Sequence, residues 1–375
     1  MIYFDNAASG GFKPGTVIDA ANIAAKFMYS NPGRSAHRLA NSAAEIIFNT
    51  RKNISRFFNN DSLERVCFTK NCTEALNTAL FGTVKQGGNI ITSAAEHNSI
   101  LRPLYQLQKL NLVSVTYIDP DENGKISLEK LGKAITKDTY LAAFNHISNV
   151  TGNILNVSET GKFLREKNII FLMDAAQSCG HVPVDMQSDC IDILCFPSHK
   201  GLYGIQGGGG IVFNENTGIN PLTFGGTGTE TFNENQPENY PERLESGTLS
   251  FPAISALNEG IKYTAANLAV FNDVLMKNTK YLINELNKIE DLRVYSGINP
   301  AGIVSFESSK LSSMELSTNL SLKYDIATRG GFHCAPRIHK LLKTDRNGLL
   351  RASLSAHNTI KEIDIFVAAV RDLIS

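Results

Sequence analysis

The segment F-L-M-D-A-A-Q-S, residues Phe171–Ser178, is an apolar, strand-like run that ends in a carboxylate. A buried carboxylate is costly unless a cation pairs with it, so Asp174 at the end of such a strand indicates a positively charged ligand. Open α/β sheets bind ligands at the carboxyl ends of their parallel strands. The segment therefore predicts a strand inside a parallel sheet and a binding site at its end.

Further apolar runs of strand length alternate with helical patterns on both sides of this segment. The expected strands are Arg65–Thr69, Asn89–Thr92, Leu112–Ile118, Tyr140–Phe144, Ile169–Met173, Asp192–Phe196 and Gly210–Phe213, with helices from about Thr73 and Ser99. This alternation is typical of an α/β fold in which helices cover both faces of a mostly parallel sheet.

A smaller α+β unit is expected at the C-terminal end. From about Phe251 the pattern changes to long amphipathic helices, through Lys288. Short strands are expected near Leu292–Tyr295, Gly302–Phe306, Ile326–Arg329 and Leu349–Ser353, and a closing helix from about Ile360. Because 375 residues exceed the usual size of one core, we expect a large domain over residues 15–255 and a small one over 256–375, with residues 1–14 near the latter.

The polar stretch Asn214–Pro241 separates these two blocks. It contains G-G-T-G-T and N-E-N-Q-P-E-N and shows no clear periodicity. Long segments without regular structure are uncommon in compact domains and are often functional. We expect a functional loop or a subunit contact here.

Composition excludes several classes of protein. Thirty-six basic and thirty-six acidic residues cancel, and no Lys/Arg run with interleaved aromatics recommends a nucleic-acid partner. No stretch is apolar for long enough to span a bilayer, so no membrane role is expected. The N-terminus lacks a secretory pattern, which favours the cytoplasm. A small-molecule substrate is the natural expectation.

The cysteines are not spaced for a structural metal site or a disulfide framework. They are Cys67, Cys72, Cys179, Cys190, Cys195 and Cys334. Five are interpreted as small apolar residues of the interior. Cys334 is different because of the segment around it, described below.

Two other predicted strand ends carry polar signals. In T-K-N-C-T-E-A-L-N, residues 69–77, a helix is expected to begin at about Thr73. The Thr73 hydroxyl and the free backbone amides around Cys72 could bind a phosphate group. An ordinary helix N-cap is the competing interpretation. In A-A-E-H-N-S, residues 94–99, His97 stands where an imidazole can stack on an aromatic ring and move a proton.

A further strand end holds a lysine, in F-P-S-H-K-G-L-Y-G, residues 196–204. If Lys200 is buried there, its pKa falls and its amine becomes a nucleophile for an aldehyde. A solvated loop lysine is the alternative. The succession of phosphate turn, histidine, strand-end Asp174 and Lys200 favours the nucleophile, and Gln177 is expected to donate to a phenolic oxygen.

Together these segments resemble the class V aminotransferase family of fold-type I pyridoxal-5'-phosphate (PLP) enzymes, and within it the cysteine desulfurases and selenocysteine lyases with a short active-site loop. The resemblance runs nearly end to end. It also includes Y-F-D-N-A-A (3–8), S-N-P-G-R-S-A-H (30–37), H-I-S-N-V-T-G (146–152), R-L-E-S-G-T (243–248), R-G-G-F-H-C-A-P (329–336) and L-R-A-S-L-S-A-H-N-T (350–359).

The resemblance implies a role for each matching residue around the cofactor. Lys200 is the Schiff-base lysine, His97 stacks on the ring, Asp174 pairs with the pyridine nitrogen and Gln177 with the phenolic oxygen. Cys72, Thr73, Ser198 and His199 are expected at the phosphate, and Pro197 stands where the family usually has a hydroxyl. Thr248 matches a threonine that reaches the phosphate of the neighbouring subunit, which implies a homodimer.

For the substrate, the resemblance assigns its carboxylate to Arg351, a planar two-pronged donor, with Asn149 and Ala8 nearby. Cys334 is expected to attack the sulfur of L-cysteine and to carry it as a persulfide while L-alanine is released. Arg329 and His333 are expected to favour the thiolate. A packed strand-end cysteine is the competing interpretation.

Other functions share the same motifs. Selenocysteine lysis, cysteine-sulfinate desulfination and transamination of a small amino acid all fit the fold, and a non-catalytic sulfur-relay or scaffold protein is the rival from another class. A sulfur-acceptor protein is a possible partner, with iron–sulfur cluster assembly as one destination. The intact Lys200, Asp174 and His97 argue against the scaffold.

Overall fold

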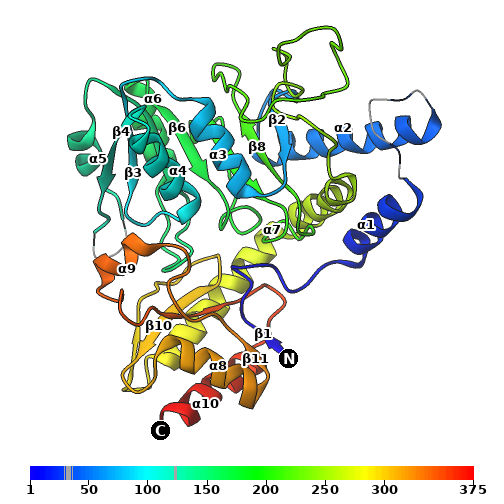
Figure 1. Cartoon of the computed structure of the whole chain (residues 1–375). Helices are drawn as coiled ribbons and strands as arrows, with labels where there is room; N and C mark the ends of the chain where they lie inside the picture. The colour runs from blue at the N-terminus through cyan, green and yellow to red at the C-terminus, as the bar shows by residue number, and fades with distance from the viewer. Residues whose placement is uncertain (29, 31–34, 36, 122–124) are drawn as a thin grey trace.

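A mixed sheet forms the centre of the larger part of the molecule (Figure 1). The structure is a computed structural model that describes residues 1–28, 30, 35, 37–121 and 125–375, so most of the predicted motif 30–37 lies outside the described residues. The strands are β2 (Val66–Thr69), β3 (Gly88–Ser93), β4 (Val113–Ile118), β5 (Thr139–Asn145), β6 (Ile170–Asp174), β7 (Ile193–Pro197) and β8 (Gly209–Phe213). Their order is β2-β8-β7-β6-β5-β3-β4.

The strands from β4 to β7 are parallel, and β8 runs antiparallel to both of its neighbours. The parallel register sets Asn145 on β5 opposite Asp174 on β6, and Asp174 opposite Cys195 on β7. The carboxyl ends of these strands therefore bring polar side chains to one edge of the sheet.

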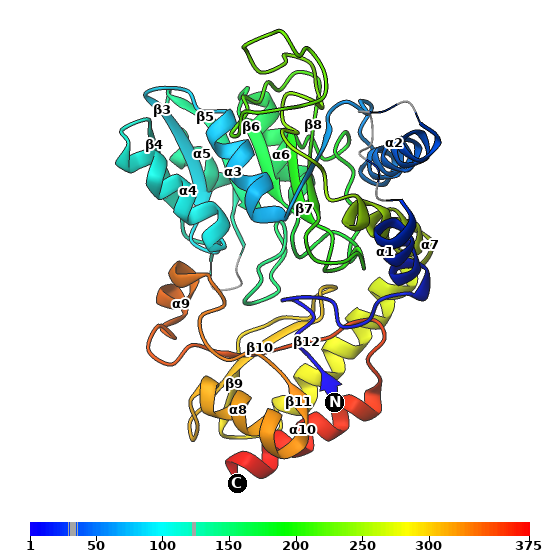
Figure 2. The ribbon, with the colours of Figure 1, turned by 45° about the vertical axis from the view of Figure 1, so that its right-hand side comes forward.

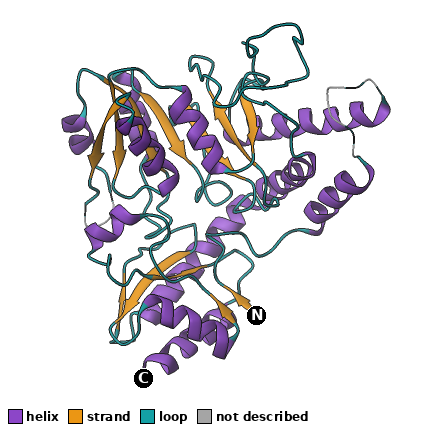
Figure 3. Cartoon of the chain, in the orientation of Figure 1, coloured by secondary structure: helices purple, strands orange, loops and turns teal. Residues whose placement is uncertain are grey.

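Helices cover both faces of this sheet, as the alternating pattern predicts (Figure 3). They are α1 (Gly15–Phe27), α2 (Arg38–Phe58), α3 (Cys72–Gly82), α4 (Asn98–Lys109), α5 (Leu128–Ala134) and α6 (Val157–Glu166). One core cluster joins the sheet to α2 and α6, through residues such as Phe58 and Leu164. Another joins it to α3 and α4, through residues such as Leu80 and Leu104. The sheet is thus buried on both sides, which explains its continuously apolar strands.

Side-chain caps fix where the helices at the sheet edge begin. The Asn71 side chain accepts a hydrogen bond from the backbone N–H of Glu74 at 2.9 Å and starts α3. The His97 side chain accepts from the N–H of Ser99 at 3.0 Å and starts α4. Both caps leave helix N-termini directed at the sheet edge, where unpaired amides favour an anion.

The smaller part contains two small sheets and the C-terminal helices (Figure 2). Strands β9 (Leu292–Val294), β10 (Ile303–Ser308) and β12 (Leu350–Ser353) form an antiparallel sheet, and β1 (Ile2–Tyr3) pairs in parallel with β11 (Ile326–Ala327). Its helices are α8 (Ser313–Tyr324), α9 (Pro336–Leu342) and α10 (Ile360–Ile374). Its core includes Phe4, Phe306 and Phe366, so the N-terminal strand packs within this unit.

Helix α7 (Phe251–Leu286) crosses between the two parts as a single element of 36 residues (Figure 1). The sequence pattern predicted several long helices here. The proposed boundary between residues 255 and 256 falls inside α7, and the division into domains stays a prediction. Between β8 and α7 the structure has no helix or strand among the described residues, in line with the irregular stretch 214–241.

The described residues show neither a membrane span nor a metal-binding cluster. None of their helices combines the length and hydropathy that a bilayer span requires. They also hold no group of three or more His, Cys, Asp or Glu side chains arranged to bind a metal ion.

Candidate active site

A cavity of about 220 Å³ opens at the carboxyl ends of the parallel strands. It is lined by Ala7, Ala8, Asn71, Cys72, Thr73, Leu76, His97, Ser99, Asn145, Ile147, Asn149, Asp174, Ala176, Gln177, Pro197, His199, Lys200, Arg329 and Arg351. Most of the predicted site residues are in this wall. Ser198, Thr248 and Cys334 are not.

Asp174 and Lys200 stand at the ends of adjacent strands, β6 and β7. The Asp174 Oδ1 atom accepts hydrogen bonds from the Ala176 N–H at 2.8 Å and from the Cys72 thiol at 3.5 Å. Burial raises the pKa of Asp174, and these donors and Lys200 oppose the shift. Burial lowers the pKa of Lys200, and Asp174 opposes that shift. An amine with a lowered pKa thus lies near a buried carboxylate whose ionised form a cation would stabilise.

His97 is joined to Thr73 through one hydroxyl. The Ser99 Oγ atom lies 2.9 Å from His97 Nδ1 and 2.8 Å from Thr73 Oγ1. The Ser99 N–H also donates to Nδ1, so the proton of the neutral ring is on Nε2. Burial, with Lys200 next, lowers the pKa of His97 to about 4. The imidazole is therefore neutral at physiological pH and rigidly oriented.

The three residues before Lys200 differ in where their side chains go. Pro197 and His199 line the cavity. Ser198 is buried, and its hydroxyl donates to the carbonyl of Ile205, in the turn that leads to β8. Burial lowers the pKa of His199 to about 4, so this ring is also neutral. A role for Ser198 at a phosphate stays a prediction.

Arg351 is almost completely buried, at 1% exposure, and two of its nitrogen atoms donate hydrogen bonds. Its Nη2 donates to Asp5 Oδ1 at 2.9 Å, and its Nη1 donates to the Asn149 carbonyl at 3.0 Å. The remaining donor, Nε, is buried without a partner among the described residues. Arg351 thus has one nitrogen atom, Nε, that makes no hydrogen bond to the described residues.

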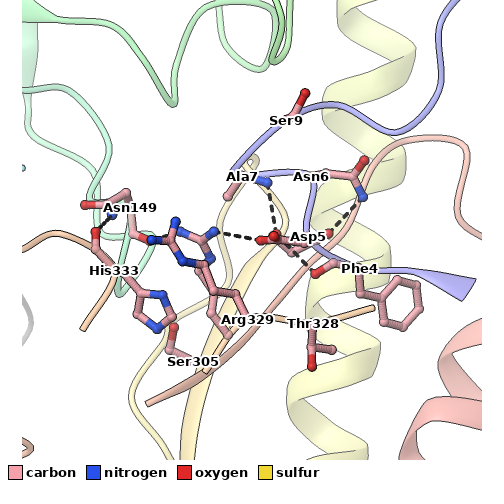
Figure 4. Close-up of polar contacts among 12 residues, drawn as sticks. Phe4, Asp5, Asn6, Ala7, Ser9, Asn149, Ser305, Thr328, Arg329 and His333 are labelled. Carbon is pink, nitrogen blue, oxygen red and sulfur yellow. Dashed lines mark hydrogen bonds and ion pairs between the residues drawn. The ribbon is translucent and has the colours of Figure 1, made fainter. Parts of the chain in front are cut away.

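Cys334 lies outside the cavity wall on an exposed loop, held at three points. Its carbonyl accepts from the Asn98 N–H at 2.7 Å, and the His333 carbonyl accepts from Asn149 Nδ2 at 2.8 Å (Figure 4). The His333 ring contacts the Leu349 carbonyl at 2.9 Å. His333 and Cys334 have φ angles of 48° and 57°, a left-handed conformation that costs L-residues about 1–2 kcal/mol each. The loop is therefore strained and anchored.

Arg329 connects this thiol to the cavity. It lines the cavity wall, and its Nη2 lies 3.7 Å from the Cys334 Sγ atom. His333 does not share this role, because its ring is directed to Leu349 and burial lowers its pKa to about 2. The expectation that His333 favours the thiolate is wrong in this geometry, since a neutral ring turned away offers no positive charge.

Thr248 lies outside this cavity, exposed on the loop before α7. It lines a second cavity of about 300 Å³, together with Lys70, Glu74 and the glycines 207–209. The Ser246 hydroxyl donates to the Thr223 carbonyl at 3.1 Å and ties the loop to itself. The reach of Thr248 into a second subunit stays a prediction.

Sequence reasoning missed three residues that shape the site. Ser99 links His97 to Thr73, Asp5 pairs with Arg351, and Glu96 accepts the Asn145 N–H at 2.8 Å from a fully buried position. Asp5 and Glu96 were inside the quoted motifs 3–8 and 94–99. The available signal was an acidic residue beside apolar ones, Asp5 after Phe4 and Glu96 after Ala95.

Unpartnered polar atoms show what kind of ligand fits the cavity. Among the described residues, the buried atoms Asn149 Oδ1, Gln177 Oε1, His199 Nδ1 and Arg351 Nε have no hydrogen-bond partner. The Gln177 amide nitrogen donates to the Ala7 carbonyl at 3.0 Å and keeps a second hydrogen. An amine with lowered pKa, a strand-end carboxylate, a helix N-terminus and a flat histidine suit a phosphorylated aromatic aldehyde with a cationic ring nitrogen.

Comparisons with known proteins agree with this donor set. The family model described as aminotransferase class-V matches residues 2–366. A probable cysteine desulfurase of Pyrococcus abyssi is 33% identical, over 100% of this chain and 94% of that protein. A cysteine desulfurase of Salmonella newport is 30% identical, over 99% and 92%. A solved cysteine desulfurase of Thermococcus onnurineus superposes with a TM-score of 0.91 at 30% identity, covering 100% and 94% of the two chains. The chain therefore belongs to the aminotransferase class-V family.

Proposed function

We propose that this chain is a PLP-dependent cysteine desulfurase that converts L-cysteine to L-alanine and receives the sulfur on Cys334 as a persulfide. The names of its full-length relatives support the activity. One observation carries the proposal: Lys200, Asp174 and Arg351 line the same cavity. Arg329, in the same wall, contacts the exposed thiol of Cys334.

PLP is the cofactor used by this family, and the residues present suit it. When bound, it supplies an electron sink for the electron pairs released at the substrate's α- and β-carbons. Asp174 would face the ring nitrogen, His97 the ring and Gln177 the phenolic oxygen. Phosphate contacts are proposed for Thr73, for His199 and for the amides at the start of α3, including that of Cys72.

Lys200 would hold the cofactor and then act as the base for the substrate. Its lowered pKa means that a larger fraction of the amine is free to take the α-proton near neutral pH. Arg351 would bind the α-carboxylate through its free Nε, while Asp5 and the Asn149 carbonyl keep the guanidinium in place. Ala8, in the same wall, would limit the space beside the substrate.

Cys334 would take the sulfur. Its thiolate attacks the sulfur of the substrate, an S–S bond forms, and the Cβ–S bond breaks with its electron pair remaining on the carbon. That carbon gains a proton and becomes the methyl group of alanine. The persulfide then passes its outer sulfur to an acceptor thiol, or a reductant releases it as sulfide.

Two kinds of partner follow from the same proposal. The exposed Thr248 would contact the cofactor phosphate of a second copy of the chain, making a homodimer. The exposed loop of Cys334 would meet a sulfur-acceptor protein. A cytoplasmic location with reduced cysteines suits a reactive thiol, and the structure has all six cysteines free.

Release of sulfide and alanine from L-cysteine, with a thiol reductant, tests the proposal. The wild type is compared with Lys200→Ala and Cys334→Ala, and with Cys190→Ala as a control at a half-buried cysteine outside the cavity. Equal amounts of both products from wild type and control, lost in the other two variants, would support the desulfurase.

Selenocysteine and cysteine sulfinate serve as comparison substrates in the same assay. If L-cysteine is inert while either of them turns over without Cys334, the proposed activity is wrong, although PLP chemistry at Lys200 survives. If no substrate turns over and the protein with added PLP shows no visible absorbance, the cofactor proposal fails as well.

A further inference from the structure

The thiol of Cys72 makes a contact that the proposed reaction does not use. Cys72 begins α3, whose start is fixed by the Asn71 cap, and its Sγ lies 3.5 Å from Asp174 Oδ1. Cys72 is buried and its side chain belongs to the cavity wall. A residue at the first turn of one helix is thus in contact with the carboxylate at the end of β6.

The proton of this contact is on sulfur. Burial raises the pKa of Cys72 well above its ordinary value, and the nearby Asp174 adds to that shift. Asp174 has its own pKa raised by burial, and the Cys72 contact lowers it. The direction of both effects agrees with a neutral thiol that donates to a carboxylate.

The two donors to Asp174 share one oxygen. The Ala176 N–H and the Cys72 thiol both meet Oδ1, and no hydrogen bond to Oδ2 occurs among the described residues. The carboxylate is therefore held with one oxygen occupied and the other available to a cation in the cavity. The Ala176 amide belongs to the same chain segment as Asp174, so Cys72 is the donor that comes from outside it.

Other thiols near Asp174 do not make such a contact. Cys179 and Cys195 are buried, and burial followed by the charge of Asp174 raises the pKa of each thiol, but neither thiol donates a hydrogen bond to Asp174 in the described structure. Cys179 also lies outside the cavity wall. It is therefore a matched control, with the same side chain and burial but without the contact.

We propose that Cys72 is a positioning residue that donates its S–H to Asp174, orients the carboxylate and holds it ionised for the ring nitrogen of the cofactor. This inference rests on the proposed PLP site. Without this donor, Asp174 would be a stronger base and would draw the proton that it shares with the ring nitrogen of the bound cofactor. The cofactor ring would then carry less positive charge and would be less electron-withdrawing. The Lys200 nitrogen attached to the cofactor would therefore be more basic.

The test uses the holoenzyme and three variants, Cys72→Ala, Cys72→Ser and Cys179→Ala. Two properties are measured: the PLP dissociation constant, and the pH midpoint of the visible absorbance of the bound cofactor. Cys72→Ala is expected to weaken PLP binding by about 3- to 10-fold, the size of one ordinary hydrogen bond because a thiol is a weak donor, and to raise the pH midpoint. Cys72→Ser keeps a donor and should stay near wild type.

Failure has a distinct signature. If Cys72→Ala matches Cys179→Ala in both measurements, or if Cys72→Ser behaves as Cys72→Ala, then the thiol acts only through its volume and the inference is wrong. If the wild type shows no visible absorbance with PLP, the proposed function itself fails. Circular dichroism of each variant establishes that the fold is retained.

Discussion

Lys200 and Cys334, the two reactive groups of the proposed site, stand in opposite surroundings. Lys200 lies just after β7, in the wall of a cavity, and burial lowers the pKa of its amine. Cys334 is on an exposed, left-handed loop, and its thiol lies beside Arg329 of the cavity wall. A base that works on one bound substrate is best fixed in a buried wall. A thiol that must meet the substrate and then an acceptor is best kept at the rim.

The largest effect is expected at the buried Lys200. Lys200→Ala removes the amine that would hold the cofactor and take the α-proton, so product formation should fall at least about a thousandfold. The visible absorbance of the lysine-bound cofactor should disappear as well. Alanine release and absorbance spectra of purified protein with PLP measure both.

Controls separate the two regions in this experiment. Cys334→Ala should lose product but keep the absorbance, and Lys310→Ala, at an exposed surface ion pair, should change neither. Equal loss of absorbance in the Cys334 and Lys200 variants would show that the two regions are not independent.

A stability effect is expected where the wall meets the N-terminal segment. Asp5→Ala leaves the buried Arg351 cation without its ion-pair partner and should reduce the free energy of unfolding by about 2–4 kcal/mol. Asp325→Ala removes a surface pair with the N-terminus and should cost under about 1 kcal/mol. Urea unfolding measures both variants, and similar losses would contradict the special role given to Asp5.

A pH effect is expected from Glu96, which is fully buried behind the same wall. Burial raises its pKa from 4.5 to about 8. Between these values the folded protein keeps a proton that the unfolded chain has lost, so this group makes stability fall as pH rises. Glu96→Gln removes this pH-dependent contribution. The free energy of unfolding of the variant, relative to that of the wild type, should therefore rise from pH 5 to pH 8 by up to about 1.4 kcal/mol per pH unit.

The measurement for Glu96 is urea unfolding of both proteins at pH 5, 6.5 and 8. His97→Gln at a shared pH series is a useful comparison, because a histidine with lowered pKa has the opposite sign: its stabilising neutral form is lost as pH falls toward 4. A constant difference between Glu96→Gln and wild type across the series would contradict the raised pKa.

The smallest effect is expected at the exposed Cys334, in the rate at which its thiol reacts. Arg329 lies beside the Cys334 sulfur, where its charge stabilises the negative charge that sulfur carries during attack. Arg329→Gln should slow alkylation of Cys334 by iodoacetamide about 3- to 10-fold at pH 7. Arg346→Gln, a change in the turn after α9, serves as the control, and equal rates in both variants would exclude this role for Arg329.

Periodicity predicted most of the sheet because its strands are apolar and end at polar residues. The runs around Phe171 and Leu194 are buried on both faces, and their ends at Asp174 and Pro197 were visible as changes in composition. Helices were placed only from about Thr73, Ser99, Phe251 and Ile360, so the remaining helices were not located individually. For α5 and α9 the reason is length, since seven residues show fewer than two full turns of periodicity. The sequence pattern also did not predict that β8 runs antiparallel to its neighbours, because the direction of a strand depends on the chain segment that connects it to the preceding strand.

The candidate site was predictable where a residue lies at or just after the carboxyl end of a parallel strand. Asp174 ends β6, His97 and Lys200 follow the ends of β3 and β7, and all three line the cavity. Ser198 is turned toward Ile205, and His333 toward Leu349, because neighbouring carbonyls in tight loops compete for their donors. Such local competition depends on loop geometry, which the sequence pattern does not specify.

The most direct test of the central claim follows where the sulfur goes. The wild type and Lys200→Ala are incubated with L-cysteine in the absence of a reductant, and the cysteine-containing peptides are then examined by mass spectrometry. We expect the added mass of one sulfur atom on the Cys334 peptide of the wild type and on no cysteine of Lys200→Ala. Alanine formation with an unmodified Cys334, or added sulfur on another cysteine instead, would contradict it.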